Sequence, residues 1–286
     1  MLSASVSSTP TQRAFETDAL RIGRAAIVSL YDELALAPKP GLVSFVDAGS
    51  HSDMDASTFM RSLFALRHYF AGCARLGAER APFAELEALG IAAEARMLQA
   101  TAGVNTHRGA VFTLGLLCAA AGRLDEPCTP LALRQSLRTG WGEALELRRS
   151  RSATTNGQRA ARTLGLRGAG DEAALGFPVL FEHALPALAH ARRSGLDDRH
   201  ARLHTLFEIM SVLADTNLAH RGGIAGLRYA QSEARNFLRA GGAMQPDALA
   251  HARSIHRAFV ERHLSPGGAA DVLAAASLVE RICRSA

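Results

Sequence analysis

Apolar residues recur along most of this chain at the three- and four-residue spacing of an amphipathic helix. Such stretches cover 13–36, 83–101, 107–121, 130–148, 179–194, 198–218, 222–240, 246–263 and 268–284, and Asp55 or Ser57 can cap one more helix that continues through Phe59 and Phe70. No segment alternates convincingly at the two-residue period of a strand, and Val and Ile are few. The pattern therefore predicts an all-α fold of around ten helices.

Two internal segments interrupt the helical period. Pro38, Pro40 and Gly41 break it in APKPGLVSFVDAGSHSDMD, which predicts a long irregular loop. Residues 149–178 are rich in Gly, Ser, Thr and Arg, so we expect an extended loop or flap with at most a short helix. We expect residues 1–12 to be a disordered tail. Because no obvious linker separates two cores, 13–286 is expected to form a single domain.

Charge and composition narrow the class of partner. The net charge of +5 favours acidic ligands such as nucleotides or CoA-like molecules. Arginines are spread through the helical segments and only 6% of residues are aromatic, which argues against nucleic acid. The cysteines show no CxxC spacing, the N-terminus has no secretion signal, and the apolar runs are shorter than the ~20 residues of a membrane span. We therefore expect a cytoplasmic protein without membrane association.

An Asn shortly before His-Arg-Gly occurs twice, in GVNTHRGAVF (103–112) and in DTNLAHRGGI (215–224). In the first copy Asn105 or Thr106 can cap the helix that follows, and the remaining N–H groups and positive helix end would attract an anion. Arg108 would add a bidentate contact to phosphate. The repeat could reflect a diverged duplication, two walls of one pocket, or coincidence, and a capped helix with an exposed Arg would explain Asn105 alone.

The second copy adds a carboxylate, Asp215, to the similar set Asn217, His220 and Arg221. Asp215 is the one carboxylate beside a His-Arg-Gly element, which makes it the first candidate for a general base or metal ligand. The pair Gly222–Gly223 is expected where one helix ends and another begins, which is also ordinary C-cap chemistry.

Two further polar clusters lie beside helix breaks. The prolines around Lys39 should hold it on a rigid loop where it could meet a phosphate. Asp53 and Asp55 supply the hard oxygen ligands that Mg²⁺ prefers, although capping of the next helix is an alternative role. In SPGG, Gly267 and Gly268 can present backbone N–H groups to a ligand, and the alternative is capping of the last helix by Ser265 and Asp271.

The stretches PKPGLV, HSDMD, GVNTHRGAVFTLGLL, GFP, DTNLAHRGG and SPGGAADVLA, in this order over residues 38–280, resemble the ATP:dephospho-CoA triphosphoribosyl transferase family. These are the triphosphoribosyl-dephospho-CoA synthases of citrate lyase and malonate decarboxylase. Just before GFP the family usually has Arg-Gly-Glu, whereas this chain has Gly170, Asp171 and Glu172.

The resemblance implies a reaction in which ATP and 3′-dephospho-CoA are joined and adenine is released. The product, 2′-(5″-triphosphoribosyl)-3′-dephospho-CoA, would pass to a carrier-protein holo-synthase. It further implies that the triphosphate is held by Lys39, Arg108, Arg221 and a Mg²⁺ ion on Asp53, Asp55 or Asp215. In the same reading His107 or His220 protonates the adenine, and Asn105, Asn217, Gly267 and Gly268 complete the substrate site.

The Arg- and Ala-rich composition is typical of a high-GC bacterium and favours malonate decarboxylase over citrate lyase as the pathway. Two other functions stay open. A Mg²⁺-dependent nucleotide N-glycosidic hydrolase would release adenine without dephospho-CoA, and a non-catalytic nucleotide- or CoA-binding module would release none. The sequence leaves the oligomeric state open, with a homodimer among the alternatives.

Overall fold

The computed structural model describes residues 10–149 and 155–284, and within them every regular element is a helix. This confirms the all-α prediction. The α-helices are α1 (Pro10–Ala35), α2 (Ala56–Leu66), α3 (Tyr69–Ala78), α4 (Phe83–Ala100), α5 (Arg108–Gly122), α6 (Pro130–Arg149), α7 (Asn156–Leu164), α8 (Ala169–Ala174), α9 (Leu185–Arg193), α10 (Asp198–Val212), α11 (Thr216–Arg239), α12 (Ala248–Glu261) and α13 (Gly267–Arg284). A π-helical segment, η1 (Val179–Ala184), leads into α9, and a short 3₁₀ turn, η2 (Gly242–Met244), follows α11.

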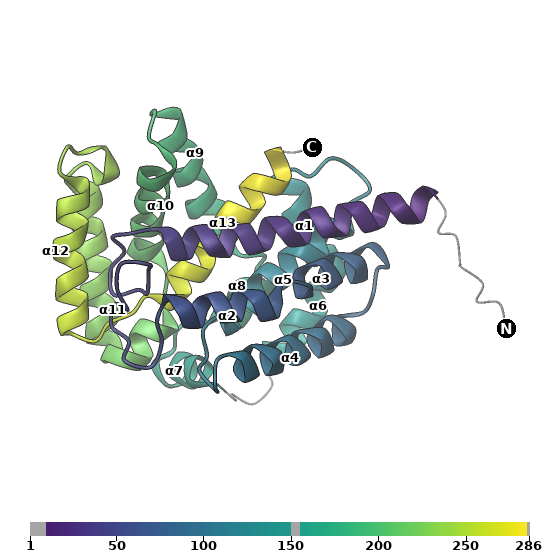
Figure 1. Ribbon diagram of the computed structural model, residues 1–286, viewed down its shortest axis with the longest axis horizontal. Helices are drawn as coiled ribbons and strands as arrows, with labels where there is room; N and C mark the ends of the chain where they lie inside the picture. Colours follow the sequence, from purple (N-terminus) through teal and green to yellow (C-terminus); the bar gives the residue numbers. More distant parts are fainter. Residues whose placement is uncertain (1–9, 150–154, 285–286) are drawn as a thin grey trace.

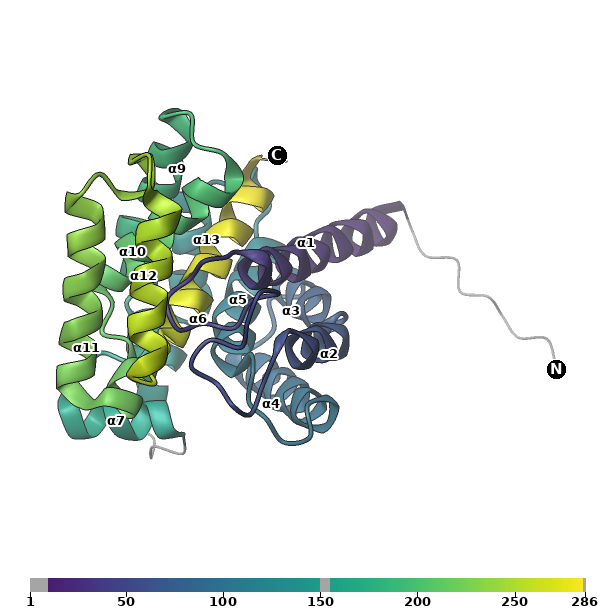
Figure 2. The ribbon, with the colours of Figure 1, turned by 60° about the vertical axis from the view of Figure 1, so that its left-hand side comes forward.

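Helix α13 runs through the middle of the molecule, with α1 and α5 on one side and α10 on the other (Figure 1, Figure 2). Most of its side chains from Ala269 to Ile282 are buried, and many of them are alanines. Small side chains let neighbouring helices pack closely on several faces of one helix. The C-terminal helix therefore carries the core on which the other helices are arranged.

Helices α3 and α5 approach each other through a reciprocal pair of glycines. A Cβ atom on Gly77 would overlap the backbone carbonyl of Ala119, and one on Gly122 would overlap the carbonyl of Ala74. Neither position has room for a methyl group, because the obstacle is backbone and cannot rotate away. The two glycines therefore set the distance between α3 and α5, and α5 carries the first Asn…His-Arg-Gly copy at its start.

Several predicted boundaries were wrong. The helix expected through Phe59 and Phe70 is two helices, because the chain breaks between Leu66 and Tyr69. Helix α10 ends at Val212 instead of 218, and α11 begins at Thr216. The glycine pair was expected where one helix ends and another begins, and α11 does break there, because Gly223 adopts φ 62° and ψ −165° at a kink between two helical stretches.

The 149–178 segment was expected to hold at most a short helix, and this expectation was wrong because α7 and α8 occupy most of its described part. The start of α7 is a capping box, in which Thr155 and Gln158 bond reciprocally to each other's backbone N–H at 3.2 Å.

Most of the predicted tail, residues 1–9, lies outside the described residues, and α1 begins at Pro10, three residues before the expected start.

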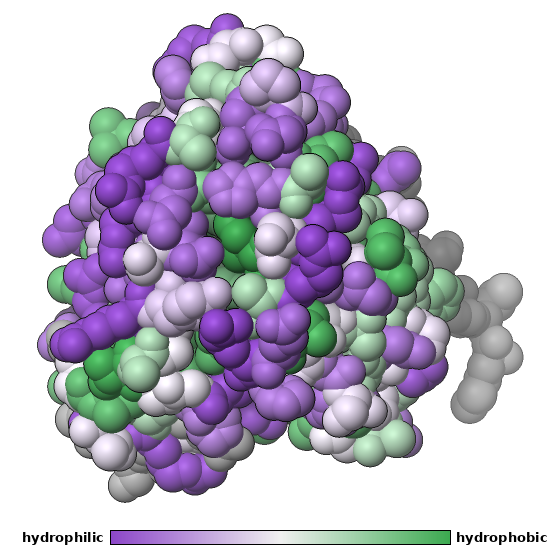
Figure 3. All heavy atoms as spheres, turned by 90° about the vertical axis from the view of Figure 1, so that its left-hand side faces the viewer, coloured by the Kyte–Doolittle hydropathy of each residue, from purple (hydrophilic) through white to green (hydrophobic). Residues whose placement is uncertain are grey.

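The face on the side of α11 and α12 is mostly hydrophilic, with hydrophobic residues scattered in small groups (Figure 3). None of the helices that the structure describes combines the length and the apolar character needed to cross a membrane.

The glycine contact between α3 and α5 predicts a contrast between three alanine substitutions. Gly77→Ala or Gly122→Ala should lower the free energy of unfolding by about 1–3 kcal/mol, the usual cost of overpacking. Gly142→Ala in α6 should raise it by roughly 0.5–1 kcal/mol, because a Cβ there meets nothing within 4 Å. Urea denaturation of the three variants measures both effects, and equal stability of Gly77→Ala and Gly142→Ala would contradict the packing argument.

Candidate active site

The starts of three helices meet at one cavity of about 1270 Å³. Helix α5 reaches it with Arg108, α11 with Thr216 and α13 with Gly267, and helix α7 lines it as well. A pocket for one drug-sized ligand usually measures ~300–1,000 Å³, so this cavity suits a ligand at or above that size. Because helix N-termini carry partial positive charge, the wall where they meet favours an anionic ligand.

Asp215 joins two of these helix starts. Its Oδ1 accepts hydrogen bonds from the N–H groups of Asn217 (2.8 Å) and Leu218 (3.3 Å) at the start of α11. Its Oδ2 accepts one from Ala269 (2.9 Å) in the first turn of α13. The side chain is buried, and burial raises its pKa although the backbone N–H groups oppose this shift. Asp215 does not line the cavity, so the structure places it behind the wall, as a double helix cap.

The glycines that follow in α13 fit against this cap. A Cβ on Gly268 would lie 3.1 Å from the Asp215 carboxylate, and one on Gly267 would lie 2.8 Å from Asn217 Nδ2. Both glycines line the cavity, as expected for substrate-binding residues. However, the Gly268 N–H is already engaged by Asp215, so it is less available to a ligand than the sequence suggested.

Asp271 is a cavity carboxylate that the sequence suggested only as a possible helix cap. It lies in α13, and its carboxylate accepts a hydrogen bond from the N–H of Ala110 at the start of α5. A Cβ on Gly109 would overlap its Oδ2, so the glycine makes this approach possible. Burial and the negative charges of Glu33 and Asp215 hold the pKa of Asp271 well above its usual range. No sequence spacing links Asp271 to Gly109, because only the fold brings them together.

Lys39 was expected to be displayed to a phosphate, and this expectation was wrong. Its side chain is buried, and its ammonium group donates to the backbone carbonyl of Glu33 (2.7 Å) and forms an ion pair with the Glu33 carboxylate. Glu33 lines the cavity, whereas Lys39 does not. Lys39 therefore contacts the cavity only indirectly, by holding the Glu33 side chain. Glu33 was not a candidate from the sequence, because it lies within an ordinary helical stretch.

His107 is buried in the cavity wall and neutral. Its Nδ1 lies 2.6 Å from the Ser62 hydroxyl, and its Nε2 has no hydrogen-bond partner among the described residues. Burial and the nearby Lys39 lower its pKa to about 3. At neutral pH it is therefore not an imidazolium that could protonate a leaving group, which removes the basis of the acid role expected for His107. His220, by contrast, is exposed at the cavity.

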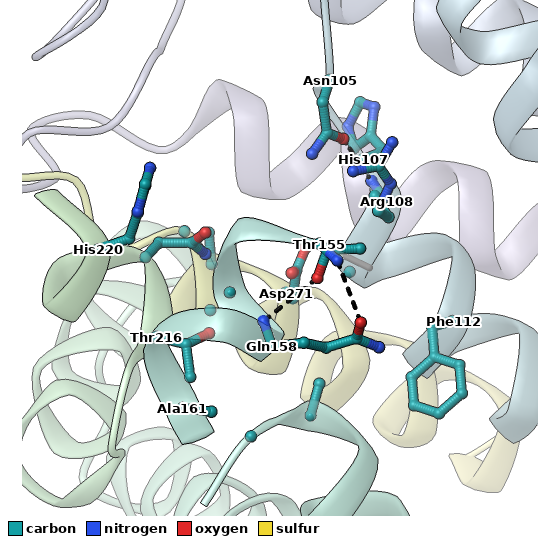
Figure 4. A pocket seen from close by; sticks show the side chains of 18 of the residues that line it. Asn105, His107, Arg108, Phe112, Thr155, Gln158, Ala161, Thr216, His220 and Asp271 are labelled. Carbon is teal, nitrogen blue, oxygen red and sulfur yellow. Dashed lines mark hydrogen bonds between the residues drawn. The ribbon is translucent and has the colours of Figure 1, made fainter. Parts of the chain in front are cut away.

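The two Asn…His-Arg-Gly copies line the same cavity. Asn105 and His220 lie on opposite sides of it in Figure 4, with Asp271 between them in that view. Arg108 donates from Nε to Glu94 (2.9 Å), and its backbone N–H donates to the Asn105 side chain (3.1 Å).

In the second copy, Arg221 donates to the carbonyl of Ser50 (3.1 Å) and lies 3.0 Å from His51 Nδ1. Asn217 also lines the cavity, and α7 adds Arg159 and Arg162, which sequence reasoning missed. The Thr155-x-x-Gln158 capping box was the signal that could have placed this helix.

The carboxylates expected to bind Mg²⁺ do not meet. Asp55 caps α2 by accepting from the Thr58 N–H (2.8 Å) and hydroxyl, and these bonds lower its pKa to about 2. Asp53 is exposed and faces His51 at 3.5 Å, and neither Asp53 nor Asp55 lines the cavity. No group of three or more His, Cys, Asp or Glu side chains in the described part of the chain is arranged to hold a metal. Asp53, Asp55 and Asp215 therefore do not fit a metal site built by the protein.

Together, the helix starts and the arginines form a cavity wall that suits an anionic ligand, in a protein whose described elements are all helical. The family model described as ATP:dephospho-CoA triphosphoribosyl transferase matches residues 19–285, and the chain belongs to this family. Family members are triphosphoribosyl-dephospho-CoA synthases, so the chain is a transferase, and the family implies ATP and dephospho-CoA as substrates. No solved structure matches the chain.

The double cap predicts that Asp215→Asn is destabilising. The amide would turn an NH₂ group toward backbone N–H donors, so the free energy of unfolding should fall by about 1–3 kcal/mol. Asp55→Asn is the matched control, because Asp55 caps a single exposed helix start and should cause a smaller loss. Urea denaturation compares the two, and wild-type stability of Asp215→Asn would contradict the assignment.

The low pKa of buried His107 predicts that the stability of the protein depends on pH. An unfolded His takes up a proton below pH ~6.5, whereas His107 in the folded state does so only near 3. Its stabilising contribution is therefore complete above pH ~6.5 and is lost as the pH falls, by up to about 1.4 kcal/mol per pH unit. Urea denaturation between pH ~5 and ~8 should show a smaller slope for His107→Gln than for wild type, and identical slopes would refute the buried neutral state.

Proposed function

We propose that the chain transfers the triphosphoribosyl group of ATP to the 2′-hydroxyl of 3′-dephospho-CoA and releases adenine. The bond from O2′ to C1′ of the ATP ribose forms while the bond from C1′ to adenine N9 breaks. The observation that supports this most is the meeting of three helix starts and several arginines at one cavity of about 1270 Å³. A triphosphate carries several negative charges, and such a wall suits it.

The triphosphate would lie along the starts of α5 and α11, between the two Asn…His-Arg-Gly copies. Arg108 uses its Nε for Glu94, which leaves the outer N–H groups of the guanidinium for a phosphate oxygen. Asn105, Asn217 and His220 add polar groups from both copies. Helix α7 contributes two more positively charged side chains, Arg159 and Arg162, to the cavity wall.

Magnesium is proposed only as the ion that accompanies the triphosphate of ATP. Mg²⁺ keeps several waters and commonly binds substrate phosphates with few protein ligands, so it does not require the three carboxylates that fail to converge.

The product would be the precursor of the prosthetic group of an acyl carrier subunit, passed on by a holo-synthase that recognises the carrier protein. The Arg- and Ala-rich composition favours malonate decarboxylase as the pathway. We further propose a cytoplasmic setting and keep a homodimer as a candidate assembly.

The test is adenine release, followed by HPLC, with ATP, Mg²⁺ and 3′-dephospho-CoA each omitted in turn. The proposal expects adenine only with all three, together with a dephospho-CoA adduct heavier by one triphosphoribosyl group. Adenine without dephospho-CoA would instead identify a hydrolase, and no adenine at all would identify a binding protein.

In the same assay Arg108→Ala should raise the KM for ATP by about 10–100-fold, since a hydrogen bond from a charged group contributes about 1.5–3 kcal/mol. Arg253→Ala is the matched control, because Arg253 is exposed on α12 and does not line the cavity. Equal KM values for the two variants would remove Arg108 from the triphosphate site.

A further inference from the structure

Five carboxylates line the cavity, and each of them has a partner within the protein. Glu87 is paired with Arg148 and Glu94 with Arg108, while Asp171 accepts the N–H of Gly168 at the start of α8. The other two are Glu33 on α1 and Asp271 on α13, helices that pack against each other. Their environments differ in a way that bears on the chemistry.

Asp271 sits among groups that disfavour its charged form. Glu33 faces it from α1 and Asp215 from the start of α11, and both are acidic. One backbone N–H, that of Ala110, opposes their effect, and the neutral His107 contributes no positive charge. Burial acts in the same direction as the acidic neighbours, so the carboxyl group retains its proton at a higher pH than an ordinary Asp.

Glu33 has the opposite environment. The Lys39 ammonium contacts both its carboxylate and its backbone carbonyl, and Lys39 is itself held by the fold, since its carbonyl lies 2.8 Å from His256 Nδ1. These contacts set the orientation of the Glu33 carboxylate. The two carboxyl groups thus meet different neighbours in one cavity, acidic groups around Asp271 and a cation beside Glu33, and unlike environments are what separate an acid from a base.

A second observation indicates that this wall meets a ligand. His107 Nε2 and Thr106 Oγ1 are buried without a hydrogen-bond partner among the described residues, and both residues line the cavity. Leaving a buried polar atom unpaired costs about 1–3 kcal/mol, so a bound molecule that supplies the missing partners is expected here.

We infer that Asp271 is the general acid that protonates the departing adenine and that Glu33, oriented by Lys39, is the base that accepts the proton of the attacking hydroxyl. This inference rests on the proposed function. Asp271 and Glu33 are catalytic residues in this scheme, and Lys39 is a positioning residue.

The proton balance closes with these two groups. The C1′–N9 bonding pair leaves with adenine, which takes the Asp271 proton and departs as the neutral base. The 2′-oxygen forms its bond to C1′ and gives its proton to Glu33. Passing one proton from Glu33 to Asp271, directly or through water, restores both groups, and no oxidant or further reactant is required.

A change of leaving group separates the role of a general acid from that of a general base, because only the acid protonates the leaving group. With ATP, Asp271→Asn should lower kcat by about 10²–10⁴-fold, the usual contribution of a general acid. With a ribose triphosphate that carries 4-nitrophenol at C1′, the leaving group departs as a stable anion, and the loss should fall below about tenfold. Glu33→Gln should lower the rate with both donors, because each needs the same hydroxyl to attack.

Asp32→Asn is the matched control. Asp32 is the neighbour of Glu33 on α1 and pairs with Arg202 and Arg281 outside the cavity. It should retain activity with both donors, even if its stability falls. An equally large loss for Asp271→Asn with ATP and with the nitrophenyl donor would overturn the acid role.

The pH profile and the infrared spectrum give independent readouts. The wild-type rate should fall as the pH rises through the raised pKa of Asp271, and Asp271→Asn should lack this limb. In the ligand-free protein, difference infrared spectra against Asp271→Asn should show a protonated carboxyl band at neutral pH, and an ionised Asp271 would refute the inference. If the wild type released no adenine while this band was present, the proposed function itself would be wrong, and the acid assignment would fall with it.

Discussion

The buried carboxylate of Asp215 is the interaction on which the rest of the site depends. One oxygen binds the first turn of α11 and the other binds the first turn of α13, two elements that lie more than fifty residues apart in sequence. A carboxylate that bridges two positive helix ends fixes both their separation and their directions. Because α13 also carries Asp271 and packs on α1 and α5, the bridge helps to place Asp271 against the cavity residues of those two helices.

The Asp215 bridge uses backbone N–H groups that could otherwise bind an anionic ligand, and arginine side chains supply contacts in their place. Asp215 occupies N–H groups at the starts of α11 and α13, and Asp271 and Asn105 occupy others at the start of α5. The helix ends therefore attract an anion mainly through their dipoles, and direct contacts must come from side chains. This explains why arginines from α5, α7 and α11 surround the cavity.

Much of the fold and part of the site could be predicted from the sequence. Helical periodicity located most elements because burial of one helix face leaves a regular trace, and the two Asn…His-Arg-Gly copies marked helix starts at one cavity. The α7 helix was missed because its composition is polar, although its capping box was readable. The roles of Lys39, Glu33 and Asp271 could not be predicted, since each depends on a contact between segments that only the folded chain brings together.

The buried pair of Lys39 and Glu33 also restricts how this protein can change during evolution. Removing one member of a buried ion pair leaves an uncompensated charge and typically costs about 3–5 kcal/mol, a large share of the stability of an ordinary domain. Replacing both together avoids most of that loss, but two changes in separate codons rarely arise at once. The irregular loop that carries Lys39 is therefore tied to the end of α1, and the two positions are expected to vary only in concert across descendants of this chain.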